Sequence, residues 1–169
     1  IQGPEDGEYA IKPLLQLIKK ANEERPSAII IGCFDDTGLE KAREVSLCPV
    51  LGIGEASFMV SKLHSGQTAV ITTVHEAVPV IKKNIENSGY QNQINEVIAA
   101  DVEVLELEFN PAESAMKFAL ASKLLKPNTK NIILGCAGAV RIKDEFESIT
   151  GYTAFDGVTS AAKLCRALV

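Results

Sequence analysis

The sequence predicts an α/β fold of two lobes related by a pseudo-twofold axis, each a parallel sheet flanked by helices, with a cleft between them. Two observations carry this prediction. Short runs of Ile, Val and Leu alternate with longer segments of helical periodicity, which is typical of parallel strands joined by helices. The pattern strand, Gly-Cys, helix, strand, Gly, helix also occurs twice, as expected of duplicated lobes.

The first part of the chain predicts three helices and two strands. The helices are expected at residues 7–24, 37–45 and 55–63, and the strands at 27–32 and 49–53. Both strands are short and apolar, which is typical of strands that are buried on both faces. Asp35 or Asp36 is placed to cap the helix at 37–45.

The rest of the chain predicts further strand–helix units without a low-complexity linker between them. Strands are expected at 67–74, within 95–107, at 131–135 and at 152–157, and helices at about 76–88, 111–126, 140–148 and 160–169. The alternating apolar and acidic stretch at 102–109, "VEVLELEF", predicts a strand with one solvent-exposed face. We assign residues 1–64, with 153–169 packing back, to one lobe and residues 65–152 to the other.

The repeat places two cysteines in equivalent positions. With Cys33 aligned on Cys136, the glycines before them align, and Gly54 falls on Gly157 and Ser57 on Ser160, all at a spacing of 103 residues. Both cysteines follow a strand and precede a helix. Because sites in parallel sheets form beyond the carboxyl ends of the strands, we expect the two thiols to line one cleft from opposite sides.

Two opposed thiols can invert a carbon stereocentre without a cofactor. A thiolate removes the proton from one face of the carbon, and a thiol returns a proton to the other face. The free N–H groups of a following helix favour a thiolate, and backbone N–H groups in the Gly-Cys turns can stabilise an enolate-like oxygen. Asp35 and Asp36 would oppose a thiolate at Cys33 if they pointed into the cleft.

Two other functions are compatible with the same residues. One is a hydrolase or isomerase in which Cys33 or Cys136 is the nucleophile and His75 is its base. The other is a protein that binds a ligand without turnover. Cys48 and Cys165 end no repeated strand, so we expect them to be structural.

Composition and charge exclude several classes of partner. The net charge is −5 with no block of Lys or Arg, which argues against binding to nucleic acid or to an anionic membrane. Four cysteines without a CxxC pair and two scattered histidines predict neither a disulfide framework nor a zinc site, and they favour the reducing cytoplasm. We therefore expect a small-molecule substrate, no metal and no cofactor. The chain starts at Ile1, and we expect the natural protein to carry a further N-terminal segment.

Several motifs resemble those of the Asp/Glu/hydantoin racemase superfamily. They are "GCFDDTGLEKARE", "CPVLGIGEASF", "AVITT", "ILGCAGA" and "FDGVTSAAKL", in the family's order and over nearly the whole chain. The pattern is similar to that of the hydantoin and allantoin racemases. The glutamate and aspartate racemases instead carry Cys-Asn-Thr and Cys-Thr at the two cysteines, and the decarboxylase branch keeps only one cysteine.

The resemblance implies cofactor-independent racemisation of a 5-substituted hydantoin or a related cyclic ureide such as allantoin, with amino-acid racemisation as the alternative. It also implies a homo-oligomer. The family pattern makes Cys33 and Cys136 the catalytic acid and base, and it implies substrate contacts for Phe34, Thr72, Thr73, Ala137 and Gly138. The family opens with a strand and an Asn-Pro-Asn-like loop that contributes to substrate binding, and the present sequence does not contain this segment.

Overall fold

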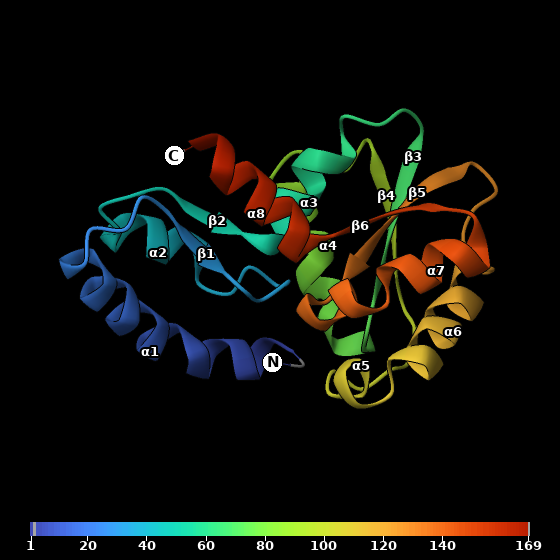
Figure 1. Cartoon of the computed structure of the whole chain (residues 1–169), viewed down its shortest axis with the longest axis horizontal. Helices are drawn as coiled ribbons and strands as arrows, with labels where there is room; N and C mark the ends of the chain where they lie inside the picture. The colour runs from blue at the N-terminus through green and yellow to red at the C-terminus, as the bar shows by residue number, and fades with distance from the viewer. Residues whose placement is uncertain (2, 169) are drawn as a thin grey trace.

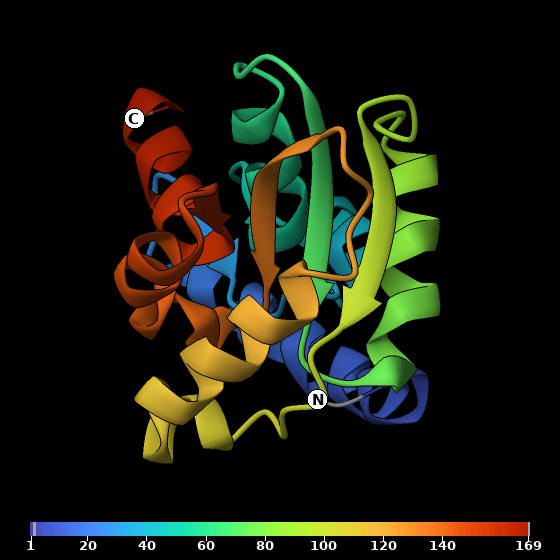
Figure 2. The same cartoon turned by 90° about the vertical axis from the view of Figure 1, so that its right-hand side faces the viewer.

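The computed structural model describes residue 1 and residues 3–168, which form two parallel sheets flanked by helices (Figure 1). The smaller sheet has two strands in the order β1-β2, and the larger sheet has four in the order β4-β3-β5-β6. All neighbouring strands in these sheets are parallel, and Figure 2 shows β4, β3 and β5 side by side. The predicted α/β class with parallel sheets is therefore confirmed.

Strands and helices alternate along the chain. The strands are β1 (Ile29–Ile31), β2 (Val50–Gly52), β3 (Gln67–Thr72), β4 (Ile94–Ala99), β5 (Thr129–Gly135) and β6 (Thr153–Asp156). The α-helices are α1 (Pro4–Glu23), α2 (Leu39–Val45), α3 (Ile53–Ser61), α4 (Val78–Asn87), α5 (Glu106–Phe109), α6 (Pro111–Ser122), α7 (Lys143–Thr150) and α8 (Gly157–Leu168), and the 3-10 helices are η1 (His75–Ala77) and η2 (Ala137–Arg141). No helix in the described part of the chain combines the length and apolar character needed to cross a bilayer.

The smaller sheet packs against the first two helices. Ile18 of α1, Ile31 of β1, Leu39 and Ala42 of α2 and Val50 of β2 form one buried cluster. The apolar face of α1 therefore fixes the sheet from one side, as burial of a continuous apolar stripe is the main source of helix–sheet stability.

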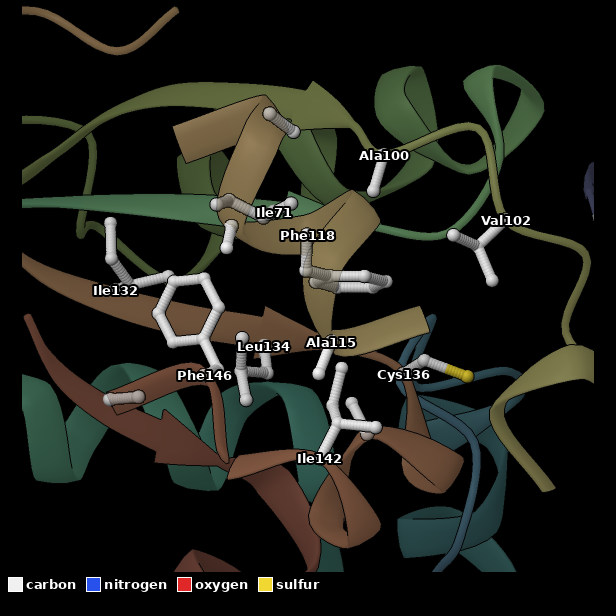
Figure 3. Packing of buried hydrophobic residues seen from close by; sticks show 14 of the residues in the cluster. Ile71, Ala100, Val102, Ala115, Phe118, Ile132, Leu134, Cys136, Ile142 and Phe146 are labelled. Atoms are coloured by element: carbon white, nitrogen blue, oxygen red, sulfur yellow. The ribbon is translucent and has the colours of Figure 1, made fainter. Parts of the chain in front are cut away.

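The larger sheet is buried on both faces because successive side chains of a strand point in opposite directions. In β5, Ile132 and Leu134 face the cluster formed with α6 and α7, whereas Ile133 faces the cluster that includes α3, α4 and α8. Phe118 and Phe146 fill the first of these faces (Figure 3). The central residues of β3 and β5 are consequently apolar, which explains why these strands were predictable from the sequence.

Helices α3 and α8 occupy equivalent positions in the repeat and pack against each other (Figure 1). Each begins directly at the end of a strand, α3 after β2 and α8 after β6. Near the start of each helix a buried serine hydroxyl donates a 2.6 Å hydrogen bond to a backbone carbonyl, from Ser57 to Gly54 and from Ser160 to Asp156. The alignment of these residues in the sequence thus corresponds to a shared local structure.

Residues 153–168 contact both sheets. Strand β6 is the edge strand of the larger sheet, next to β5, whereas α8 contacts β1 and β2 of the smaller sheet as well as β5 and β6. The division of the chain into lobes at residues 64 and 153 stays a prediction.

The segment 102–109 is not the strand that its alternating pattern predicts. The chain leaves the larger sheet after Ala99, and Asp101 has a φ of +54°, a conformation that interrupts an extended strand. The segment then forms the short helix α5, in which Leu107 is completely buried. Alternation over a few residues is also compatible with a turn followed by one helical turn. Here the helical turn buries the side chain of Leu107.

Candidate functional site

A cavity of about 180 Å³ opens where β1 of the smaller sheet and β3 and β5 of the larger sheet end. Its walls come from residues 32–35 after β1, residues 72–73 at the end of β3 and residues 135–137 at the end of β5, together with Ile1, Ala77 and Val104. The carboxyl ends of parallel strands are the usual place for a binding site in an α/β fold. The fold therefore forms its candidate active site where the sequence predicted one.

Cys33 and Cys136 both line this cavity. Cys33 is partly buried and follows β1, with its Sγ 3.5 Å from Oγ1 of Thr37. Cys136 follows β5 and is 9% exposed. Its sulfur lies at the margin of the hydrophobic cluster and points away from the labelled core side chains Ile132 and Phe146 (Figure 3). Thiols from the two halves of the repeat thus converge on one space.

The environment of Cys136 favours its protonated form. Burial raises the pKa of the Cys136 thiol, and the charges of Cys33 and Asp35 raise it further, whereas a hydrogen bond from the backbone N–H of Gly138 lowers it. A thiolate at Cys33 therefore favours a neutral thiol at Cys136.

The helices that follow the cysteines differ from the prediction. Helix α2 begins only at Leu39, after a turn in which the N–H of Asp36 donates a 3.0 Å hydrogen bond to the carbonyl of Cys33. Cys136 is followed directly by the 3-10 helix η2 and not by an α-helix. The N–H of Gly138, within η2, is the group that acts on the Cys136 sulfur.

Four of the five predicted substrate-contact residues line the cavity: Phe34, Thr72, Thr73 and Ala137. Gly138 does not line it. A Cβ at Gly138 would lie 3.1 Å from the Cβ of Leu107, so this glycine permits close packing of η2 against α5. Its backbone N–H forms a hydrogen bond to the Cys136 sulfur, and its contact with the substrate stays a prediction.

The two threonines differ in what their hydroxyl groups do. The buried Thr72 hydroxyl donates a 2.9 Å hydrogen bond to the carbonyl of Gly135, which joins the ends of β3 and β5. The Thr73 hydroxyl has no hydrogen-bond partner within the described chain. Phe34 is also structural in part, because its buried ring packs edge-on against Phe58 with 6.1 Å between the ring centroids. Of Thr72, Thr73 and Phe34, Thr73 is therefore the residue whose polar group is available to a ligand.

Asp35 and Asp36 occupy different environments, and neither caps the helix at 37–45 as predicted. The N-cap of α2 is Gly38, without a side-chain cap. Asp36 instead accepts hydrogen bonds from the N–H groups of Gly54 (2.9 Å) and Glu55 (2.7 Å), so it caps α3. Asp35 lines the cavity, and sequence reasoning did not include it among the site residues. The only signal for it was its position two residues after Cys33.

His75 lies outside the cavity. Its Nε2 is 2.9 Å from a carboxylate oxygen of Asp101, and both side chains are about three-quarters exposed, at 73% and 74%. His64 is also exposed and packs edge-on against Phe155. Neither histidine is among the residues that line the cavity, so the arrangement of a cysteine nucleophile with a histidine base is not present there.

Comparison with known proteins identifies relatives over the whole chain. The sequence model of the family described as Asp/Glu/Hydantoin racemase matches residues 1–165. A hydantoin racemase from Rhizobium meliloti is 34% identical, over 100% of this chain and 71% of its own length. A hydantoin racemase from a Pseudomonas species (strain NS671) is 28% identical, over 97% of this chain and 67% of its own length.

The solved structures agree with this relationship. An allantoin racemase from Klebsiella pneumoniae matches with a TM-score of 0.91 and 26% identity, over 99% of this chain and 69% of that chain. A glutamate racemase from Francisella tularensis matches with a TM-score of 0.74 at 18% identity, over 96% of this chain and 64% of that chain, which supports the fold alone. With the strand-end cavity and its two cysteines, these matches show that the chain belongs to the Asp/Glu/hydantoin racemase family and is a racemase, an isomerase.

Proposed function

We propose that the protein racemises a 5-substituted hydantoin, or a related cyclic ureide such as allantoin, by a cofactor-independent mechanism with two bases, Cys33 and Cys136. The observation that carries the proposal is that both cysteines, from equivalent strand ends of the repeat, line the same cavity. A carbon acid bound between them presents one face to each sulfur. This is the arrangement that inversion by proton removal and return requires.

The surroundings of Cys136 favour a mechanism in which one cysteine accepts a proton while the other donates one. In one direction the Cys33 thiolate removes the proton and the Cys136 thiol, whose protonated form is favoured by burial, supplies a proton to the opposite face. The hydrogen bond from the N–H of Gly138 then stabilises the thiolate left on Cys136. In the other direction the roles are exchanged, so each turnover leaves the enzyme in the state that accepts the opposite enantiomer.

The substrate class rests on the relatives and on the size of the cavity. A hydantoin racemase matches at 34% identity over 100% of the chain, and an allantoin racemase matches at 26% identity over 99% of it. The volume of about 180 Å³ is smaller than the roughly 300–1,000 Å³ typical of sites for drug-sized ligands, which favours a small ring. The Thr73 hydroxyl is placed to bind one carbonyl or amide group of that ring.

The test is the incubation of single enantiomers of 5-methylhydantoin, allantoin and glutamate with the protein in heavy water, followed by chiral chromatography and mass spectrometry. We expect racemisation of a ureide well above the enzyme-free rate, with one solvent deuterium on the carbon of the inverted enantiomer. Racemisation of glutamate alone would favour the amino-acid branch of the family. Inversion of a ureide without deuterium uptake would exclude the two-base mechanism.

A further inference from the structure

The cavity that contains the two cysteines also contains a carboxyl group. Asp35 is one of its lining residues, and its negative charge raises the pKa of the Cys136 thiol. Asp35 and Cys136 come from opposite halves of the repeat and face the same space. A carboxylate there makes proton removal by Cys136 harder, so it is unfavourable for the chemistry unless it has another role.

The backbone on both sides of Asp35 is held in place. The preceding residue, Phe34, is buried against Phe58, and the following residue, Asp36, is fixed by two hydrogen bonds to the start of α3. The carbonyl of Asp35 itself accepts a 2.7 Å hydrogen bond from Nδ2 of Asn84 in α4. These three contacts hold the backbone around Asp35, so its side chain stays at the cavity.

The carboxyl group of Asp35 is not neutralised by another side chain. Among the residues that the structure describes, no side chain forms a hydrogen bond or ion pair with it, and no Lys, Arg or His lines the cavity. Burial raises the pKa of Asp35 to about 6. The group is thus mostly ionised at neutral pH and remains available to a ligand.

We propose that Asp35 determines the substrate specificity of the cavity, by accepting a hydrogen bond from an N–H group of a neutral cyclic ureide and by repelling ligands that carry a carboxylate. This inference rests on the proposed function and extends it. A hydantoin ring offers N–H donors and has no negative charge, whereas an amino acid and the ring-opened carbamoyl amino acid both carry a carboxylate. A charge in the site rejects such ligands through repulsion, and none of the described residues that line the cavity is a Lys, Arg or His that would offset it.

The first test measures charge selection without relying on turnover. Wild-type protein and Asp35→Asn are alkylated with neutral iodoacetamide and with anionic iodoacetate, and the modification of each cysteine is followed by peptide mass spectrometry. We expect Asp35→Asn to raise the ratio of the iodoacetate rate to the iodoacetamide rate about tenfold at Cys33 and Cys136, since a charge at this range has an effect of that order. The ratio at Cys48 and Cys165 should not change, and these residues serve as internal controls.

The second test uses the ureide that the wild-type protein racemises. Asp35→Asn should lower kcat/KM for this ureide about tenfold or more, as expected for loss of a hydrogen bond to a charged group. It should also tighten inhibition by the ring-opened carbamoyl amino acid. The matched control is Asp144→Asn, the same change at a fully exposed carboxylate on α7, which should leave all these quantities unchanged. Asp35→Ser provides a second uncharged variant if Asp35→Asn does not fold.

The two tests separate the possible failures. If a ureide is racemised but Asp35→Asn changes neither the alkylation ratio nor kcat/KM, the role of Asp35 is overturned. If the alkylation ratio changes but the wild-type protein racemises no ureide, the proposed function fails while the exclusion of anions by Asp35 stands.

Discussion

Asp35 and Asp36 are neighbours in the sequence and act in different parts of the molecule. Asp35 lines the cavity, whereas Asp36 has a φ of +49° and caps α3. The positive φ turns the chain sharply between them, which Asp tolerates better than most residues. A Cβ at Gly52 or Gly54 would collide with the Asp36 carboxyl group, so these glycines leave the space that the cap occupies.

The Asp36 cap gives a prediction about stability and pH. Burial raises the pKa of Asp36 to about 7 despite the hydrogen bonds from Glu55 and Gly54, which lower it. Because the folded pKa lies above the ordinary value of 3.8, the associated stability is complete below about pH 4 and is lost as the pH rises through 7. Asp35, with a pKa raised to about 6 by burial, acts in the same direction.

We therefore expect the free energy of unfolding to fall between pH 5 and pH 7.5, and to fall less steeply in Asp36→Asn. Asn also tolerates a positive φ and keeps one acceptor for the α3 N–H groups. Urea unfolding monitored by circular dichroism measures the slope, with Asp144→Asn as the control. The range stops at pH 7.5 because the raised pKa of Cys136 adds a loss of stability at higher pH. Equal slopes in wild type and Asp36→Asn would contradict the prediction.

At the residue level, the sequence identified the cysteine pair but not the direction of the polar side chains around it. Cys33 and Cys136 were predictable because each ends an apolar strand and because the repeat aligns them. The orientation of Asp35 and Asp36 depends on one positive φ and on the distant N–H groups of Gly54 and Glu55. A local pattern contains neither of these, so it predicts the nearest helix start as the partner of the Asp carboxyl group.

At the level of elements, the contact between α3 and α8 connects the two halves of the repeat. Gly157, the first residue of α8, lies so close to the start of α3 that a Cβ there would be 2.5 Å from the carbonyl oxygen of Ile53. A backbone carbonyl cannot rotate away as a side chain would. The glycine is therefore required by close helix packing and not by an unusual φ.

Replacement of Gly157 by Ala should destabilise the protein by about 1–3 kcal/mol, the range for overpacking of a well-packed interface. The matched control is Gly32→Ala, because a Cβ at Gly32 meets no atom within 4 Å, and its stability should be close to that of the wild type. Urea unfolding compares the two variants. If Gly157→Ala and Gly32→Ala had the same free energy of unfolding, close packing of α3 against α8 would not require this glycine, which contradicts the prediction.

The order and type of most elements followed from hydrophobic periodicity, and their ends did not. Helix α8 starts at Gly157, three residues before the predicted 160, because the chain enters the helix directly from β6. The predicted helix at 140–148 is divided into η2 and α7. These boundaries depend on contacts between elements, such as those of Gly157 and Leu107, which no local pattern specifies.

At the scale of the whole molecule, the repeat explains why the site lies where it does. Strands β1 and β5 are equivalent, and each delivers a cysteine from its carboxyl end to the cavity. The larger sheet also contains β3, whose end supplies Thr72 and Thr73 to the same cavity. The meeting of the ends of β3 and β5 was predictable because neighbouring parallel strands end at the same edge of a sheet. Strand β1 belongs to the smaller sheet, so the approach of Cys33 depends on how the two sheets pack, and the sizes of the sheets depend on strand pairing over long sequence distances.

The most direct test of the two-base mechanism is proton exchange by single-cysteine variants. Cys33→Ser and Cys136→Ser are each incubated with the separate enantiomers of the racemised ureide in heavy water, with Cys48→Ser, outside the cavity, as the control. Racemisation should fall about 100-fold or more in both active-site variants, since a serine is a poor proton donor and acceptor here. We predict that each of them still exchanges the proton of one enantiomer, and that the two variants act on opposite enantiomers. Full racemisation by Cys136→Ser would contradict the mechanism.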